Sequence, residues 1–398
     1  MTRTFLISLR VYGGCFIQSF STTGRRAAPL RLQRVLLLLL GFPAFIVLQL
    51  IHWLGFLLDE IFFSSYRQVR IDRPLFITGL PRSGTTFVHR TLANDRDRFT
   101  SFRTWEAILA PSIAERRFWK ALGAIDRALG RPVSRALKWS VKKATGDFSS
   151  IHAVGLDAEE EDYLALLPAG GCFILVLAFP WNESLWSLAK LSTLNQEEQK
   201  SLMNYYRRCL QKHLYVEGGG HKRLLSKNAA FASWIPTLQN EMSDARFLVC
   251  VRDPIKGLSS QLSSIEGGCS FFGTHSHFEV ISKRFEGVFR DNYAELRHST
   301  LSLVEQLVVI DQEELRVAPR ATLENALNTL DEPISEAWKK SLHDAENNSK
   351  EHRSSHQHSS ASQSFAKATI EPCVLNDYQA ILQHRRNCDP AQRDNSFS

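Results

Sequence analysis

One short stretch of the sequence, Pro74–Leu92, constrains the fold more than any other. It reads PLFITGLPRSGTTFVHRTL, in which an apolar run enters a turn flanked by two glycines and a helical pattern follows. A strand that enters a helix through such a turn directs backbone N–H groups and the positive helix end at one point, which suits a phosphate group. The pattern therefore predicts a phosphate-binding loop over Gly79–Thr86.

The residues of this loop argue against a nucleoside triphosphate site. The spacing is that of GxxxxGK[ST], but Thr85 stands where the lysine that grips the β- and γ-phosphates would be. We also find no apolar strand ending in an aspartate suited to Mg²⁺. We therefore expect a loop for one 5′-phosphate, in which Gly84 permits close backbone approach and Arg82 supplies the cation. The hydroxyl groups of Ser83, Thr85 and Thr86 would add hydrogen bonds.

Further apolar runs alternate with helical patterns downstream of this loop. The runs are RLLSK at Arg223–Lys227 and RFLVCVR at Arg246–Arg252. Because strands separated by helices form parallel sheets, we expect an α/β fold with a doubly wound, mainly parallel sheet. Ligands bind such sheets at the carboxyl ends of the strands, which is where the phosphate loop begins.

A second cationic site is expected where the last of these runs ends. Arg252 stands at the strand end and is followed by DPIKGLSS, which places Ser260 on the next helix. A guanidinium group and a hydroxyl group in this arrangement can converge on one anion. The alternative is a solvated arginine beside an ordinary serine, because exposed charges are usually only solvated.

Together these residues resemble the 3′-phosphoadenylyl-sulfate-dependent sulfotransferase superfamily, which combines a PRSGTT-type loop with an arginine–serine 3′-phosphate site. The similarity runs from about Pro74 to Ser263, includes LLSKNAAF and HAVGLDAEEED, and is nearest to the broad bacterial-type family. It implies a P-loop-like fold and 3′-phosphoadenylyl sulfate (PAPS) as the sulfuryl donor. The donor-binding residues that it implies are Arg82, Ser83, Gly84, Thr85, Thr86, Arg252 and Ser260.

Sulfuryl transfer by such an enzyme depends on positioning and on charge stabilisation. Lys227, at a predicted strand end, would balance charge on the leaving phosphate. Glu106, in RTWEAIL, is the predicted base, by its similarity to the glutamate of protein-tyrosine and carbohydrate sulfotransferases. A neighbouring tryptophan would raise the pKa of that carboxyl group. The rival for the role of base is a member of Glu159–Asp162, here called the acidic run.

The first 58 residues contain six arginines and neither aspartate nor glutamate. Residues 1–34 are typical of a basic leader, which could be unstructured, a transit peptide or the result of a mis-assigned start codon. Residues 35–64 are predicted to form a hydrophobic helix whose most apolar part, at 35–58, would measure about 36 Å, enough to span a membrane. Pro43, Gln49 and His52 interrupt it, so a helix lying in the membrane interface or buried in the core stays open.

The remaining expectations concern the catalytic domain, its partners and its location. The domain is expected over residues 71–395 and the chain at a membrane. The net charge of +7 favours anionic partners, and without a nucleic-acid-binding motif a phosphorylated ligand explains it better than nucleic acid does. Seven cysteines show no metal-ligand spacing, so no metal is expected. Aromatic residues between Thr104 and Trp186 favour a small-molecule, lipid or glycan acceptor with an apolar part, unless they form core.

Two other function classes stay open on the sequence alone. One is a P-loop kinase-like phosphotransferase, which would share the strand, loop and helix but would need the missing lysine and an Mg²⁺ carboxylate. The other is a membrane-tethered nucleotide-binding protein without catalysis, which would keep both phosphate sites and lack a usable base.

Overall fold

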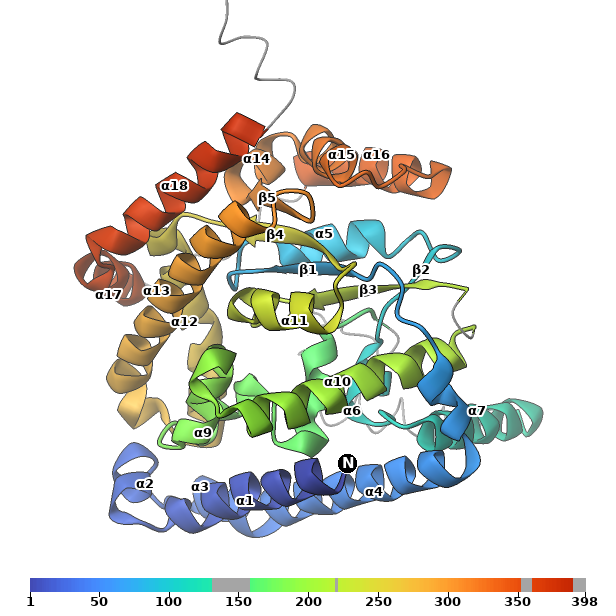
Figure 1. The fold of residues 1–398 in the computed structure, drawn as a ribbon. Coiled ribbons are helices and arrows are strands. Elements are labelled where there is room, and N and C mark those ends of the chain that lie inside the picture. The colour runs from blue at the N-terminus through green and yellow to red at the C-terminus, as the bar shows by residue number, and fades with distance from the viewer. Residues whose placement is uncertain (131–157, 219–220, 352–359, 389–398) are drawn as a thin grey trace, which may run out of the picture.

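The computed structural model describes residues 1–130, 158–218, 221–351 and 360–388. Part of the HAVGLDAEEED segment (152–157) and the end of the expected catalytic domain (389–395) lie outside the described residues. A five-stranded sheet forms the centre, and all its paired strands run parallel (Figure 1). Its strands, in the order in which they lie side by side, are β2 (Phe99–Thr100), β3 (Arg223–Asn228), β1 (Leu75–Gly79), β4 (Arg246–Val251) and β5 (Leu307–Asp311).

Helices cover both faces of the sheet because alternate strand residues enter two different cores. Leu75 and Ile77 pack into one core together with α5 (Thr85–Leu92) and α15 (Pro319–Thr329), whereas Phe76 packs into the other. A parallel sheet buried on both faces in this way is the doubly wound arrangement. The predicted α/β fold class is confirmed. One apolar strand, β5, does end in an aspartate that the sequence analysis missed, Asp311, whose carboxylate accepts a hydrogen bond from the Tyr378 hydroxyl group at 2.9 Å. The other helices that enclose the two cores are α10 (Gln196–Val216), α11 (Ile235–Glu241), α12 (Pro254–Phe272), α13 (Phe278–Ser302), α16 (Glu336–Glu351), α17 (Ser360–Thr369) and α18 (Pro372–Cys388).

The ends of the two central strands approach each other very closely. Gly79 ends β1 with a φ of +135°, and a Cβ atom added there would lie 1.9 Å from the carbonyl oxygen of Cys250 in β4. Only glycine fits this position. One residue on, the Leu80 N–H donates a hydrogen bond to the same carbonyl oxygen at 3.1 Å. The phosphate loop therefore leaves β1 directly beside the end of β4.

The first 62 residues form a layer of helices below the sheet in Figure 1. The basic leader is helical, with α1 (Thr2–Ser19) and α2 (Thr22–Ala27), and the predicted hydrophobic helix follows as α3 (Leu32–Leu36), a π-helical turn and α4 (Phe42–Phe62). The π-helical turn over Leu37–Gly41 lies just before Pro43, whose ring and missing N–H disturb the regular α-helical ladder. We call residues 2–62 the N-terminal layer.

The two long helices of this layer lie side by side and run antiparallel. Stacked or edge-on ring pairs join Phe5 to Trp53 near one end and Phe16 to Phe42 near the other. As the residue number rises along α1, that of its partner on α4 falls. The helix over Leu32–Phe62 is long and apolar enough to cross a membrane, yet only 17% of its most apolar window is buried. Most of that window is therefore exposed, which differs from the pattern of a buried core helix.

Replacing Gly79 by alanine is expected to lower the free energy of unfolding by about 3 kcal/mol or more, because the new Cβ collides with the β4 backbone and the positive φ is strained. Urea unfolding followed by circular dichroism measures this change. The matched control is Gly267→Ala in α12, where nothing lies within 4 Å of the added Cβ. That control should raise stability by up to about 1 kcal/mol. Equal effects of the two substitutions would contradict the close approach.

Candidate functional site

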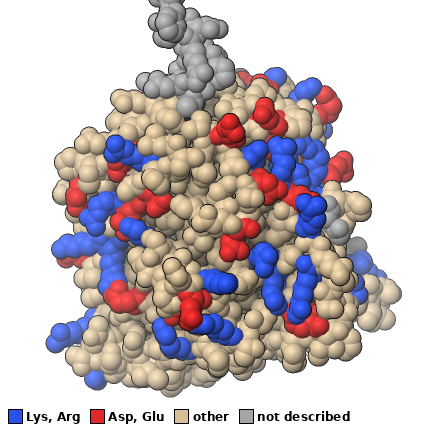
Figure 2. All heavy atoms as spheres, in the orientation of Figure 1, with Lys and Arg blue, Asp and Glu red and all other residues tan. Residues whose placement is uncertain are grey.

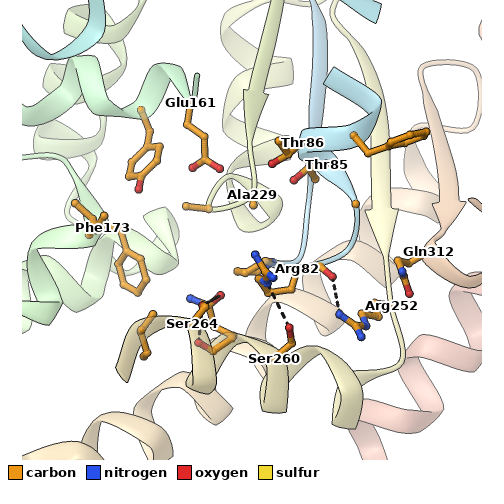
Figure 3. A pocket seen from close by; sticks show the side chains of 18 of the residues that line it. Arg82, Thr85, Thr86, Glu161, Phe173, Ala229, Arg252, Ser260, Ser264 and Gln312 are labelled. Atoms are coloured by element: carbon orange, nitrogen blue, oxygen red, sulfur yellow. Dashed lines mark hydrogen bonds between the residues drawn. The ribbon is translucent and has the colours of Figure 1, made fainter. Parts of the chain in front are cut away.

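A cavity of about 1050 Å³ lies at the carboxyl ends of the strands, lined by residues that directly follow β1, β3, β4 and β5. Figure 3 shows its polar end, where the Arg252 side chain reaches the backbone of Arg82 and the Arg82 side chain reaches Ser260. Of the seven residues expected to bind the donor, six line the cavity. They are Arg82, Gly84, Thr85, Thr86, Arg252 and Ser260.

The loop after β1 is held in an unusual conformation that opens it toward the cavity. Arg82 and Gly84 both have a positive φ, of 65° and 98°, and Gly84 is the N-cap of α5. No side chain caps that helix, so its first N–H groups stay available to a ligand. The fully buried Ser83 instead donates its hydroxyl hydrogen to the Leu80 carbonyl oxygen at 2.6 Å. Its side chain therefore braces the loop and does not reach the cavity.

The second predicted site adjoins the loop through a small network of hydrogen bonds. Arg252 Nη1 donates to the Arg82 carbonyl oxygen at 3.0 Å, and Arg82 Nε donates to Ser260 Oγ at 3.3 Å. The hydroxyl group of Tyr293 donates to the carbonyl oxygen of Arg252 and fixes the backbone there. Arg252 and Ser260, which the sequence analysis assigned to one site, therefore both contact Arg82 of the predicted phosphate loop.

This cluster has the properties of an anion site. Burial, and next the positive charge of Arg82, lower the pKa of the Arg252 guanidinium group. The buried Nε of Arg252 has no hydrogen-bond partner among the described residues. An unpaired buried donor on a cation that a neighbouring cation repels is costly unless an anion accepts from it. A phosphate-like anion would satisfy this donor, and the positive-φ loop beside it offers backbone N–H groups to a second such anion.

A buried ion pair lies on the other side of the cavity. Lys227, at the end of β3, is 4% exposed, and its Nζ lies 2.7 Å from Glu161 Oε1 and 3.4 Å from Glu160 Oε1. Glu161 lines the cavity, whereas Lys227 does not. Burial raises the pKa of the Glu161 carboxyl group, and the charge of Lys227 opposes that rise. A carboxylate with a raised pKa at a cavity wall can accept a proton from a bound hydroxyl group.

The members of the acidic run have separate surroundings. Glu159 pairs with Arg96 at 3.2 Å, away from the cavity. Asp162 is buried and accepts a hydrogen bond from the Tyr206 hydroxyl group at 2.7 Å, and burial raises its pKa to about 6. Neither of the two lines the cavity, whereas Glu161 does. Sequence reasoning included Glu161 only as one member of the run.

Glu106 lies elsewhere. It is 1% exposed and does not line the cavity, and its Oε2 accepts a hydrogen bond from the Arg103 N–H at 3.0 Å at the start of α6 (Thr104–Ile108). Its oxygens also lie 3.9 Å from the Arg116 guanidinium group and 3.7 Å from His213 Nδ1. Burial and the Arg116 charge lower the pKa of His213 well below its usual range. The geometry of Glu106 is thus that of a helix-capping carboxylate in a buried polar cluster.

Apolar side chains form a large part of the cavity wall. They come from the 3₁₀ helix η5 (Phe173–Leu177), from α12 and from α13. None of these apolar side chains was assigned to the site by number from the sequence, although Phe173 lies in the aromatic range from Thr104 to Trp186. The apolar wall residues are Phe173, Ile174, Val176, Leu177, Ile265, Phe285 and Val288. In the described part of the chain no group of three or more His, Cys, Asp and Glu residues could hold a metal ion.

Comparison with known proteins identifies the family. A model of the sulfotransferase family matches residues 74–336, more than half of the chain. The fold is similar to that of sulfotransferase STF1 from Mycobacterium tuberculosis H37Rv, with a TM-score of 0.63, 16% identity and coverage of 94% of this chain and 92% of that one. The fold is also similar to that of sulfotransferase STF9 from Mycobacterium avium, with a TM-score of 0.61, 14% identity and coverage of 93% of this chain and 95% of that one. A search of curated proteins finds no match. The chain belongs to the sulfotransferase family.

Proposed function

We propose that the chain transfers the sulfuryl group of PAPS to a hydroxyl or amine group of an acceptor, releasing adenosine 3′,5′-bisphosphate (EC 2.8.2.-). The observation that carries this proposal is the meeting of two anion sites in one cavity. The open helix start at Gly84 suits the 5′-phosphosulfate, and the cluster of Arg252 with Ser260 suits the 3′-phosphate. A nucleoside triphosphate has no 3′-phosphate, so it would leave the second site unused.

The residues around the cavity support a direct transfer. In this proposal Glu161 takes the proton from the acceptor hydroxyl group, and the freed oxygen forms a bond to sulfur. The bond between sulfur and the bridging phosphate oxygen breaks, and its electron pair stays on the leaving phosphate. Lys227, whose Nζ lies 2.7 Å from Glu161, would supply positive charge close to the Glu161 carboxylate and to the leaving phosphate. Arg82 and the N–H groups at the start of α5 hold the donor in line.

The acceptor is expected to carry an apolar part next to the reacting group. This expectation rests on the apolar wall contributed by η5, α12 and α13. We assign catalysis to residues 71–395 and a location at a membrane surface to the whole chain, since one N-terminal helix is long and apolar enough for membrane contact.

Arg252→Ala is expected to weaken binding of adenosine 3′,5′-bisphosphate by roughly tenfold to a hundredfold, because a charged hydrogen bond to the 3′-phosphate is lost. Isothermal titration calorimetry measures this effect. Arg320→Ala is the control, since Arg320 lies on α15 and does not line the cavity. Tighter binding of ATP with Mg²⁺ than of the bisphosphate by the native chain would refute the proposal and favour kinase chemistry.

Glu161→Gln is expected to lower kcat by about a hundredfold to ten-thousandfold while leaving bisphosphate binding unchanged, because a general base is removed. The assay follows transfer of labelled sulfate from PAPS to 2-naphthol. Glu106→Gln is the comparison, and we expect it to lower the melting temperature more than kcat, because Glu106 caps a buried helix. The reverse pattern would restore Glu106 as the base.

The same assay has a pH signature. Because burial raises the pKa of Glu161 above its ordinary value of 4.5, the native enzyme should gain activity as pH rises through a value above 4.5. The base is protonated below that pKa and cannot accept the acceptor's proton. In Glu161→Gln this acidic limb of kcat/KM should disappear. A limb that persists unchanged would assign the titration to another group.

A further inference from the structure

The outward face of α4 is apolar, and its polar side chains point into the protein. Gln49, His52 and Asp59 are 4%, 1% and 0% exposed. This polarity is the reverse of that of a helix on a water-exposed surface. The exposed apolar residues recur every three or four positions along the helix and the turns before it: Leu36, Leu39, Leu40, Val47, Leu50, Ile51, Leu54, Leu57, Ile61 and Phe62.

The neighbouring helix α1 repeats the inverted pattern. Thr4 and Ser8 are buried, and their hydroxyl groups are hydrogen-bonded within the protein. The exposed apolar residues on α1 and just after it are Leu6, Leu9, Ile17 and Phe20. Because α1 and α4 lie side by side, we call their exposed apolar residues together the outer face. The exposed Arg3 and Arg10 of α1 pair with Glu197 and Glu198 of α10. Soluble monomers rarely expose an apolar surface of this extent unless it binds something.

Positive charge is gathered at one end of the outer face. Arg25, Arg26 and Arg31 are exposed and have no acidic partner among the described residues. Figure 2 shows basic side chains at the end where α2 lies and an almost uncharged lower edge over α1 and α4. No acidic residue precedes Asp59 in the sequence. The layer therefore combines an apolar face with uncompensated positive charge, which suits an anionic lipid surface.

The helix Leu32–Phe62 is attached to the catalytic body along its whole length. At its start Arg34 donates hydrogen bonds to the carbonyl oxygens of Phe272 and Ala178, both at 3.0 Å. Near its middle His52 Nδ1 lies 2.6 Å from Glu115 Oε1. At its end the Asp59 carboxylate accepts from the backbone N–H groups of Ile113 and Ala114, at the start of α7 (Ile113–Ala128), at 3.0 and 2.8 Å.

A helix that crossed a bilayer would have to give up these contacts. Its polar residues would then face hydrocarbon without partners, which costs several kcal/mol for each group. With the contacts kept, the helix lies in the plane of the interface and only its outer face meets lipid. A second copy of the chain is a poorer occupant, because the two acids of the layer, Asp59 and Glu60, are already paired within the protein and leave no acid for the arginines of another outer face.

We propose that the N-terminal layer docks in the plane of an anionic membrane and that the cavity takes its acceptor, a hydroxylated amphiphile, from that membrane. The second part rests on the proposed function. Leu177 lines the cavity, and its neighbour Ala178 is bonded to Arg34 of the layer. Gly268 also lines the cavity, one helical turn before Phe272, whose carbonyl oxygen accepts from the same arginine. The apolar end of the cavity therefore adjoins the layer.

Co-sedimentation of the full chain with vesicles tests the docking. We expect binding to vesicles of phosphatidylserine and phosphatidylcholine, weaker binding to phosphatidylcholine alone, and release by high salt or alkaline carbonate. Arg25→Gln, Arg26→Gln and Arg31→Gln together should weaken binding to the anionic vesicles about a hundredfold. Val47→Ser, Leu50→Ser and Leu54→Ser together should weaken it tenfold or more.

The controls use similar residues outside the layer. Leu301→Ser with Val317→Ser changes two exposed apolar residues, and Arg320→Gln changes an exposed arginine. Both should leave vesicle binding unchanged. Resistance to carbonate would overturn the in-plane arrangement in favour of a spanning helix. Dimers that dissociate in the serine variant would assign the outer face to a second copy.

The acceptor is tested separately. Titration with adenosine 3′,5′-bisphosphate shows whether each variant keeps a folded donor site, so a failure of docking is distinguished from a failure of the proposed function. Transfer of labelled sulfate to cholesterol or to a long-chain alcohol in anionic vesicles should exceed transfer to 2-naphthol in solution, and both layer variants should abolish that advantage. Equal rates on the two acceptors would overturn the choice of a membrane amphiphile.

Discussion

The close approach of β1 and β4 is the constraint on which the site depends. The Cys250 carbonyl oxygen leaves no room for a side chain at Gly79, and the Leu80 N–H donates a hydrogen bond to that same oxygen. The chain is thereby turned into the phosphate loop at the point where Arg252 ends the neighbouring strand. Two anion sites that are far apart in sequence become adjacent because two parallel strands end at the same edge. The Arg82 guanidinium group and carbonyl oxygen connect them.

The two glutamates considered as the base, Glu161 and Glu106, have different surroundings. Glu161 meets the cavity, with a raised pKa and a lysine paired with it, whereas Glu106 is enclosed by an arginine, a histidine and the backbone that it caps. The difference lies in what each side chain faces. A carboxylate whose hydrogen bonds are fixed within the protein stabilises a helix, and one that lines a cavity is open to exchange a proton.

In the N-terminal layer, too, the surroundings of each side chain decide its role, but here the polar side chains face inward and the apolar ones face outward. Its polar side chains are satisfied inside the protein, so the face left over is apolar. The layer and the cavity share one connection, since Arg34 holds the segment after η5 and the end of α12. Any displacement of the layer would therefore reach the apolar wall of the cavity. In the arrangement that we propose, this arginine links membrane docking to acceptor selection.

The sequence by itself predicted the parallel α/β fold, which the structure confirms. It also predicted the loop after β1 and a site of Arg252 with Ser260, whose residues the structure brings to one cavity, because these predictions depend on residues close together in the chain and on local backbone geometry. It predicted as well that a long apolar helix precedes the catalytic domain. Only the tertiary structure decided that Glu161 and not Glu106 faces the cavity, because residue type and spacing do not say which wall a side chain meets. It likewise decided how the apolar helix lies, since that depends on partners of His52 that are more than fifty residues away.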